Sequence, residues 1–145
     1  MAIWFGAGFS LETANAHSKG TLVEQLGIEF VAAGDDYVSA KMPVDGRTRQ
    51  PAGVLHGGAS VALAETLASW GATFVVDREK NHCVGLEINA NHVRAIAAGW
   101  VTGTARPLHL GRSTQIWEVR IVDEQERLVC VSRVTMAVLA TPNRY

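Results

Sequence analysis

The sequence has little cysteine and almost no surplus charge. Its two cysteines, Cys83 and Cys130, are too few among 145 residues for a disulfide framework, and neither has the histidine spacing of a metal site. Thirteen Lys and Arg against fourteen Asp and Glu leave a formal net charge of −1, without the basic excess that nucleic-acid-binding proteins carry. We therefore expect reduced thiols, no metal and no nucleic-acid partner.

Long apolar runs are also lacking. Glu65 divides the best candidate for a membrane span, which needs about 18 uninterrupted apolar residues. The apolar start of the chain, residues 1–10, has no Lys or Arg before it, and Glu12 follows closely, so it is not predicted to be a signal peptide. We expect a cytoplasmic protein with no membrane partner.

What is present indicates one folded domain. Hydrophobic residues make up 48% of the chain and charged residues 19%, which is enough apolar material for a core and is unlike a disordered segment. No repeat or linker divides the sequence. We expect a single domain over residues 1–145 with its core at about 22–140.

The hydrophobic pattern predicts an α+β fold in which an antiparallel sheet wraps around one long central helix. Four strand-like segments follow that helix with no further helix between them, which argues against a doubly wound sheet. The N-terminus is predicted to be irregular. The predicted segments are a short helix at 22–26, a hairpin of strands at 28–33 and 37–42, the helix at 57–76, and strands at 83–93, 101–106, 116–122 and 128–139.

The predicted helix carries a single charge. Its apolar residues lie on nearly every face, so we expect the whole helix to be buried, and Glu65 with it. Burying an unpaired carboxylate costs several kcal/mol. Such a group is either functional or held by a structural partner, and the helix alone favours neither.

Two glycines begin the same helix, at His56-Gly57-Gly58. Free N–H groups and the positive end of the helix dipole could hold an oxygen that develops negative charge, although a glycine turn that merely starts a helix would look the same. Glu65 lies eight residues beyond Gly57, about 12 Å along the helix. If the two groups act on one carbonyl, they must come from two subunits related by a two-fold axis.

Five segments of the sequence occur together in one known family. They are Gln50-Pro51, the run 55–60 (LHGGAS), Ala64-Glu65 with Ser69, the run 85–94 (GLEINANHVR) and the run 107–111 (PLHLG). Through these segments the sequence resembles the hotdog-fold acyl-CoA thioesterases of the phenylacetate and 4-hydroxybenzoyl-CoA type. The similarity is greatest to the branch that contains bacterial 1,4-dihydroxy-2-naphthoyl-CoA hydrolases and enterobactin-proofreading thioesterases, and it extends over about residues 22–139.

The resemblance implies a role for each matched residue. Glu65 would be the nucleophile or the general base, and Gly57 would donate its N–H to the thioester oxygen with help from Gln50. His56 would lie near the sulfur, and Ser69 would position the water or the carboxylate. The residues implied to line the substrate site are Gly85, His92, Val93, Arg94, Ala95, His109, Leu110, Gly111, Arg112, Ser113 and Thr114. Of these, Arg94 and Arg112 are the candidates for contacts with the phosphates of coenzyme A.

The implied activity is hydrolysis of an acyl-CoA thioester with an aromatic acyl group, such as 1,4-dihydroxy-2-naphthoyl-CoA or a benzoyl-CoA. No cofactor is expected, because coenzyme A is part of the substrate. The expected assembly is a homodimer with shared sites that pairs into a homotetramer. Two alternatives remain open, a hotdog dehydratase acting on hydroxyacyl thioesters and a non-catalytic acyl-CoA-binding module.

Overall fold

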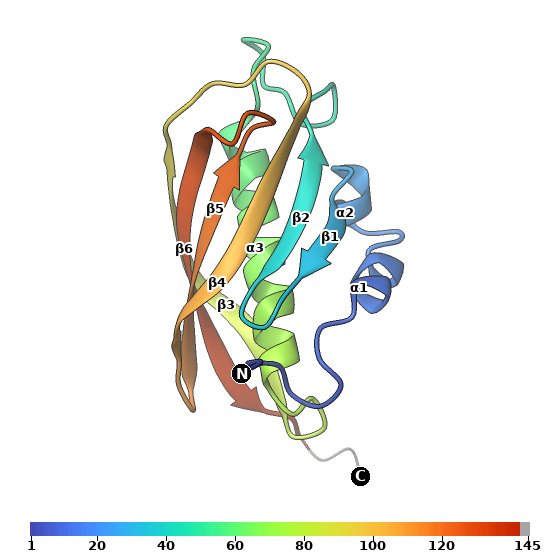
Figure 1. Ribbon diagram of the computed structural model, residues 1–145, viewed down its shortest axis with the longest axis vertical. Coiled ribbons are helices and arrows are strands. Elements are labelled where there is room, and N and C mark those ends of the chain that lie inside the picture. The colour runs from blue at the N-terminus through green and yellow to red at the C-terminus, as the bar shows by residue number, and fades with distance from the viewer. Residues whose placement is uncertain (143–145) are drawn as a thin grey trace.

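The computed structural model describes residues 1–142 and contains three helices and six strands (Figure 1). The elements follow one another as α1 (Leu11–His17), α2 (Leu22–Gln25), β1 (Glu29–Ala33), β2 (Val38–Pro43), α3 (Gly57–Val75), β3 (Asn81–His92), β4 (Trp100–Leu110), β5 (Thr114–Val122) and β6 (Leu128–Ala140).

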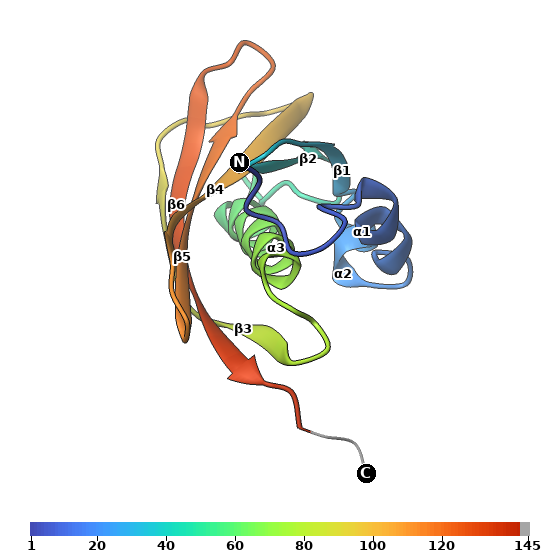
Figure 2. The same ribbon diagram turned by 60° about the horizontal axis from the view of Figure 1, so that its bottom comes forward.

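All six strands form one antiparallel sheet in the order β1-β2-β4-β5-β6-β3. The sheet curves around α3, and the end-on view shows the helix inside that curve with α1 and α2 on its open side (Figure 2). β3 pairs only with β6, so it forms one edge of the sheet. This arrangement is the hotdog fold, and it confirms the predicted α+β class.

Packing between α3 and the concave face of the sheet forms the core. On β5, Trp117, Val119 and Ile121 are fully buried, as their period-two alternation predicts. Leu67 of α3 meets them from the other side, and a Cβ added at Gly103 of β4 would lie only 2.7 Å from its Cδ1. The glycine therefore allows the helix to approach the sheet closely.

The prediction that α3 is buried on every face is wrong. Its sheet-facing side is buried, including Leu63 and Leu67, but Glu65 is exposed and Thr66 and Ser69 are only partly covered. The reason is that the sheet covers one side of the helix, while α1 and α2 are too short to cover the rest. Within residues 1–142, no helix has both the length and the apolar character needed to cross a membrane.

The N-terminus is more ordered than its sequence indicates. Ser10 caps α1 by accepting a hydrogen bond from the N–H of Thr13 at 3.1 Å, so the prediction of an irregular segment was wrong for residues 11–17. Before α1, Trp4 stacks on Trp117 with ring centroids 6.4 Å apart, and the N–H of Phe5 donates to the carbonyl of Phe74 at 2.8 Å. The segment thus crosses the C-terminal end of α3 (Figure 2).

Strand boundaries differ modestly from the predicted ones. β4 continues to Leu110, past the predicted end at Arg106, because the sheet accommodates Pro107 beside an irregularity in the pairing of β4 with β5. β5 correspondingly begins at Thr114. The two strands therefore form a longer hairpin than predicted.

Candidate active site

One backbone N–H in the first turn of α3 has no hydrogen-bond acceptor in residues 1–142. His56 is the N-cap, and its Nδ1 accepts the N–H of Gly58 at 2.7 Å. The carbonyl of His56 accepts from Ala59 and Ser60 at 3.0 and 3.3 Å. The N–H of Gly57 has no acceptor in residues 1–142. A free donor at the positive end of a 19-residue helix can bind an oxygen with negative charge.

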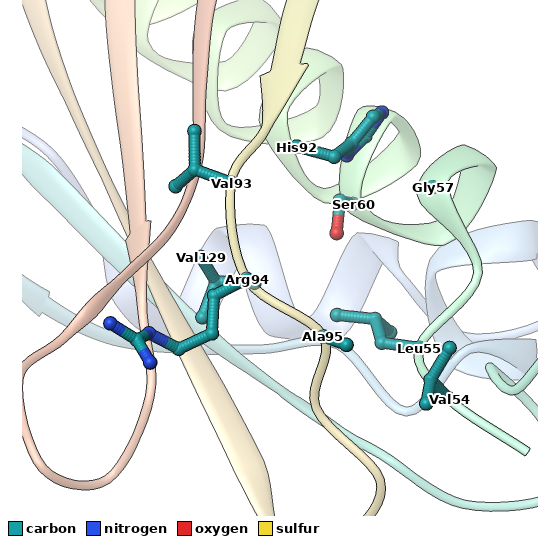
Figure 3. Close-up of a pocket in the computed structure, with 9 residues that line it drawn as sticks. All are labelled: Val54, Leu55, Gly57, Ser60, His92, Val93, Arg94, Ala95 and Val129. Atoms are coloured by element: carbon teal, nitrogen blue, oxygen red, sulfur yellow. The ribbon is translucent and has the colours of Figure 1, made fainter.

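A pocket of about 420 Å³ lies beside this turn (Figure 3). It brings together five residues of the predicted site, which are Gly57, His92, Val93, Arg94 and Ala95. A Cβ added at Gly57 would lie 3.0 Å from Nε2 of His92, so the imidazole packs against the start of the helix. The remaining lining residues are Val54, Leu55, Ser60 and Val129.

Glu65 lies in a different hollow of about 350 Å³, which it shares with Ser69. The carboxylate is exposed, so the predicted burial of Glu65 is wrong for the single chain. Gly85 of β3 is its close neighbour, since a Cβ there would lie 2.9 Å from Oε1 of Glu65. The other lining residues are Leu22, Val23, Ala62, Thr66 and Trp70.

Gln50 lies in the loop that leads to His56. Its side-chain oxygen accepts the N–H of Ala52 at 2.6 Å, which leaves the amide nitrogen of the side chain as its donor. Thr48 anchors this loop, because its hydroxyl donates to the carbonyl of Pro43 at 2.6 Å and its carbonyl accepts the N–H of His56 at 2.8 Å. Thr48 is thus a positioning residue that the sequence did not single out.

The predicted segment from His109 to Thr114 spans the tip of the β4–β5 hairpin, from the last residues of β4 to the first residue of β5. The turn is closed by a hydrogen bond from the N–H of Gly111 to the carbonyl of Thr114 at 2.8 Å. Besides Gly111 it contains Leu110, Arg112 and Ser113. Pairing across the sheet sets this turn at the same end as Gly85, whereas His92 pairs with Cys130 toward the other end. Within one chain, the predicted binding residues therefore form two separate groups.

Charges near these groups favour an anionic ligand. Arg94 and Arg112 are exposed and form no ion pair with an acidic group in residues 1–142, whereas Arg106 pairs with Asp36. The thiols are unsuited to nucleophilic attack, because burial raises the pKa of both Cys83 and Cys130. In the described part of the chain, no three His, Cys, Asp or Glu side chains are grouped as a metal site requires.

Sequence reasoning missed several pocket residues. Ser60 and Val129 line the pocket at Gly57, and Leu22 and Val23 line the hollow at Glu65. Ser60 lies within the LHGGAS segment, so its spacing from Gly57 was a usable signal. The others lie in apolar stretches that look like ordinary core.

Comparison with known proteins identifies the family of this chain. The family model of the thioesterase superfamily matches residues 52–130, more than half of the chain. The proofreading thioesterase EntH of Cronobacter turicensis is 55% identical over 130 residues, which is 90% of this chain and 94% of that protein. The 1,4-dihydroxy-2-naphthoyl-CoA hydrolase of Escherichia coli is 51% identical over 130 residues, 90% of this chain and 95% of that protein.

Among solved structures, a variant of thioesterase PA1618 from Pseudomonas aeruginosa superposes with a TM-score of 0.94 at 45% identity, covering 97% of this chain and 100% of that one. The chain therefore belongs to the thioesterase superfamily. It is an enzyme with thioesterase activity, as its family and named relatives indicate. Of the three classes considered from sequence, this favours the hydrolase over the dehydratase and the non-catalytic binding module.

Proposed function

We propose that the enzyme hydrolyses acyl-CoA thioesters with aromatic acyl groups, in two sites that are each shared between two subunits. The observation that carries the proposal is the unpaired N–H of Gly57 beside a pocket, on the same helix as an exposed carboxylate, Glu65, that lies in another hollow. Eight residues separate the two groups, about 12 Å of helix. One chain cannot bring both to the same carbonyl.

A two-fold axis removes this separation. Gly57 neighbours His92 and Glu65 neighbours Gly85, so α3 and β3 run in opposite directions with two matched positions. A two-fold axis midway between those positions would place Gly57 and His92 of one copy beside Glu65 and Gly85 of the other copy. Because the axis relates the copies symmetrically, the dimer would contain two such composite sites. It would also pair the two β3 edges antiparallel and cover their unpaired backbone groups.

The same axis supports a coenzyme A site. The backbone carbonyl of Ser113, in the β4–β5 turn, accepts a hydrogen bond from the N–H of Val138 in β6 at 2.9 Å. Val138 in turn pairs with Cys83 of β3. The two-fold axis would place Arg94 of the second copy opposite Cys83 of the first copy. Arg94 of the second copy would then lie at the same level of the sheet as Arg112 of the first copy. Two free guanidinium groups at one end of the joint sheet suit the phosphates of coenzyme A. The dimer of dimers stays a prediction, which analytical ultracentrifugation can test.

The chemistry follows from these positions. Glu65 removes a proton from water, whose oxygen attacks the thioester carbon, or the carboxylate attacks that carbon itself and water then hydrolyses the anhydride. The carbonyl oxygen becomes negative and is held by the N–H of Gly57. The oxyanion collapses, the C–S bond breaks, and the thiolate of coenzyme A leaves and takes up the proton. Ser69, one turn after Glu65, orients the water or the carboxylate.

His56 has a defined role in this scheme. Its Nδ1 accepts the N–H of Gly58, so the neutral ring carries its proton on Nε2. This Nε2–H can donate to the carbonyl oxygen or the sulfur, and the side-chain nitrogen of Gln50 can add a second donor. The helix cap thereby fixes the tautomer that the reaction uses.

The aromatic acyl group is inferred from the walls around Glu65. Trp70, Leu22 and Val23 form an apolar border to the hollow that holds the carboxylate, and a flat ring would stack well on an indole. The relative from Escherichia coli is named for a bicyclic aromatic substrate. Both observations favour an aromatic over a linear acyl group.

Steady-state hydrolysis of a panel of aromatic and aliphatic CoA thioesters tests the proposal, with thiol release as the readout. We expect the highest kcat/KM with aromatic acyl groups and a loss of about 10²- to 10⁴-fold in kcat for Glu65→Gln. Glu79→Gln, which removes an exposed carboxylate just after α3, should leave kcat unchanged. Near wild-type kcat in Glu65→Gln would rule out the catalytic role.

A further inference from the structure

Ser60 combines deep burial with an unused hydroxyl. It lies on α3 one turn after Gly57 and is 1% exposed. It lines the pocket that also contains Gly57 and His92. In Figure 3 its oxygen points from the helix into the space bordered by Leu55, Ala95 and Val129. The hydroxyl is therefore aimed at whatever fills the pocket.

The two threonine hydroxyls on this helix bond to the helix itself. Thr66 and Thr73 donate to the carbonyls of Ala62 and Ser69, one turn earlier, at 2.6 and 2.8 Å. The Ser60 hydroxyl has no hydrogen-bond partner in residues 1–142. In the same residues, every side-chain nitrogen or oxygen that is fully shielded from solvent has a partner, so the Ser60 oxygen is not fully shielded. Its oxygen must therefore reach the cavity, where a ligand could satisfy it.

We propose that Ser60 binds the first amide of the thiol arm of the substrate, the amide that two methylene groups separate from the thioester sulfur. This inference rests on the proposed function, because it takes the N–H of Gly57 as the contact for the thioester oxygen. The three-residue rise from Gly57 to Ser60 is about 4.5 Å, comparable to the span of the S–C–C–N linkage. The hydroxyl can donate to the amide carbonyl or accept from its N–H.

The rest of the pocket suits such an arm. Its walls at Leu55, Ala95 and Val129 are apolar, which matches methylene groups, and Ser60 is the polar side chain buried among them. A hydrogen bond between a buried hydroxyl and an amide contributes more binding free energy than a hydrogen bond to a hydroxyl that is already bonded to water. Coenzyme A and carrier-protein thioesters share this amide, so Ser60 recognises the thiol arm and not the acyl group.

Two thioesters of one aromatic acid separate this role from the alternatives. The N-acetylcysteamine thioester keeps the amide, and the S-ethyl thioester lacks it. We expect Ser60→Ala to raise KM for the first about five- to tenfold with kcat within about twofold, and to leave both constants for the second unchanged. Ser60→Thr, which restores a hydroxyl, should recover most of the loss. Thr73→Val, which removes a helix-bonded hydroxyl, should change neither.

Each other outcome overturns the inference. An unchanged KM for the N-acetylcysteamine thioester would mean that the hydroxyl does not contact the amide. Equal KM effects on both thioesters would assign Ser60 to the acyl group or to packing. Failure of the proposed function is distinguishable, because the wild-type enzyme would then hydrolyse neither thioester or Glu65→Gln would remain active.

Discussion

Replacing Gly57 by proline should delete one hydrogen-bond donor from α3 and little else. Proline is favourable at the first position of a helix, because its missing N–H has no partner there in any case. His56, the residue before it, already has φ −69° and ψ 130°, the extended conformation that a following proline requires. The backbone of this turn is thus prepared for the substitution.

Gly57→Ala is the matched control. Both variants add a Cβ, which at this position would lie 3.0 Å from Nε2 of His92, so both require the same small shift of the imidazole. Only the proline variant loses the N–H. The ratio of their kcat values therefore reports the loss of the donor, together with the ring Cδ that replaces the amide hydrogen in proline.

That ratio should be large. Removing one donor from a site that holds a developing oxyanion typically lowers kcat by about 10²- to 10³-fold. We expect the proline variant to fall below the alanine variant by this factor, with equal unfolding midpoints in urea. Single-turnover hydrolysis of an aromatic CoA thioester is the assay. A ratio below about threefold in well-folded proteins would refute the assignment of the N–H of Gly57 to the oxyanion.

Three further predictions concern assembly, charge and packing. Mixing Glu65→Gln chains with Gly57→Pro chains at equal amounts should restore roughly a quarter of wild-type activity, since half of the dimers are then mixed and each has one intact site; no recovery in verified mixed dimers would contradict shared sites. Arg94→Ala and Arg112→Ala should each raise KM for a CoA thioester about 1.5- to 5-fold at low salt with kcat unchanged, and should not affect a thioester without the nucleotide. Gly71→Ala should lower the free energy of unfolding by about 1 to 2 kcal/mol in urea titrations. The added Cβ would lie 2.9 Å from the buried indole of Trp117, and the cost of this overpacking exceeds the gain in helix propensity. Equal or greater stability of the variant would mean that the indole can move.

Local patterns determined much of this fold. The long helix was predicted to within one residue of its actual end at Val75, because its start is marked by His56-Gly57 and its apolar content leaves little choice. β5 followed from alternation of buried and exposed residues, a period that a strand produces whatever its neighbours are. The segment LHGGAS also stood out in the sequence, because two glycines precede a long apolar stretch and because the segment resembles one in a known family.

Only the tertiary structure decided which residues distant in sequence lie beside one another. Strand order, with β3 at an edge, depends on contacts between residues distant in sequence, and no local period encodes them. Apolar composition predicted a buried Glu65, but burial depends on what covers each face, and the sheet covers only one. The hydroxyl of Ser60 looked like any helical serine until its neighbours were known. Its hydrogen-bonding state is a property of the surrounding cavity, so the residue itself could not reveal it.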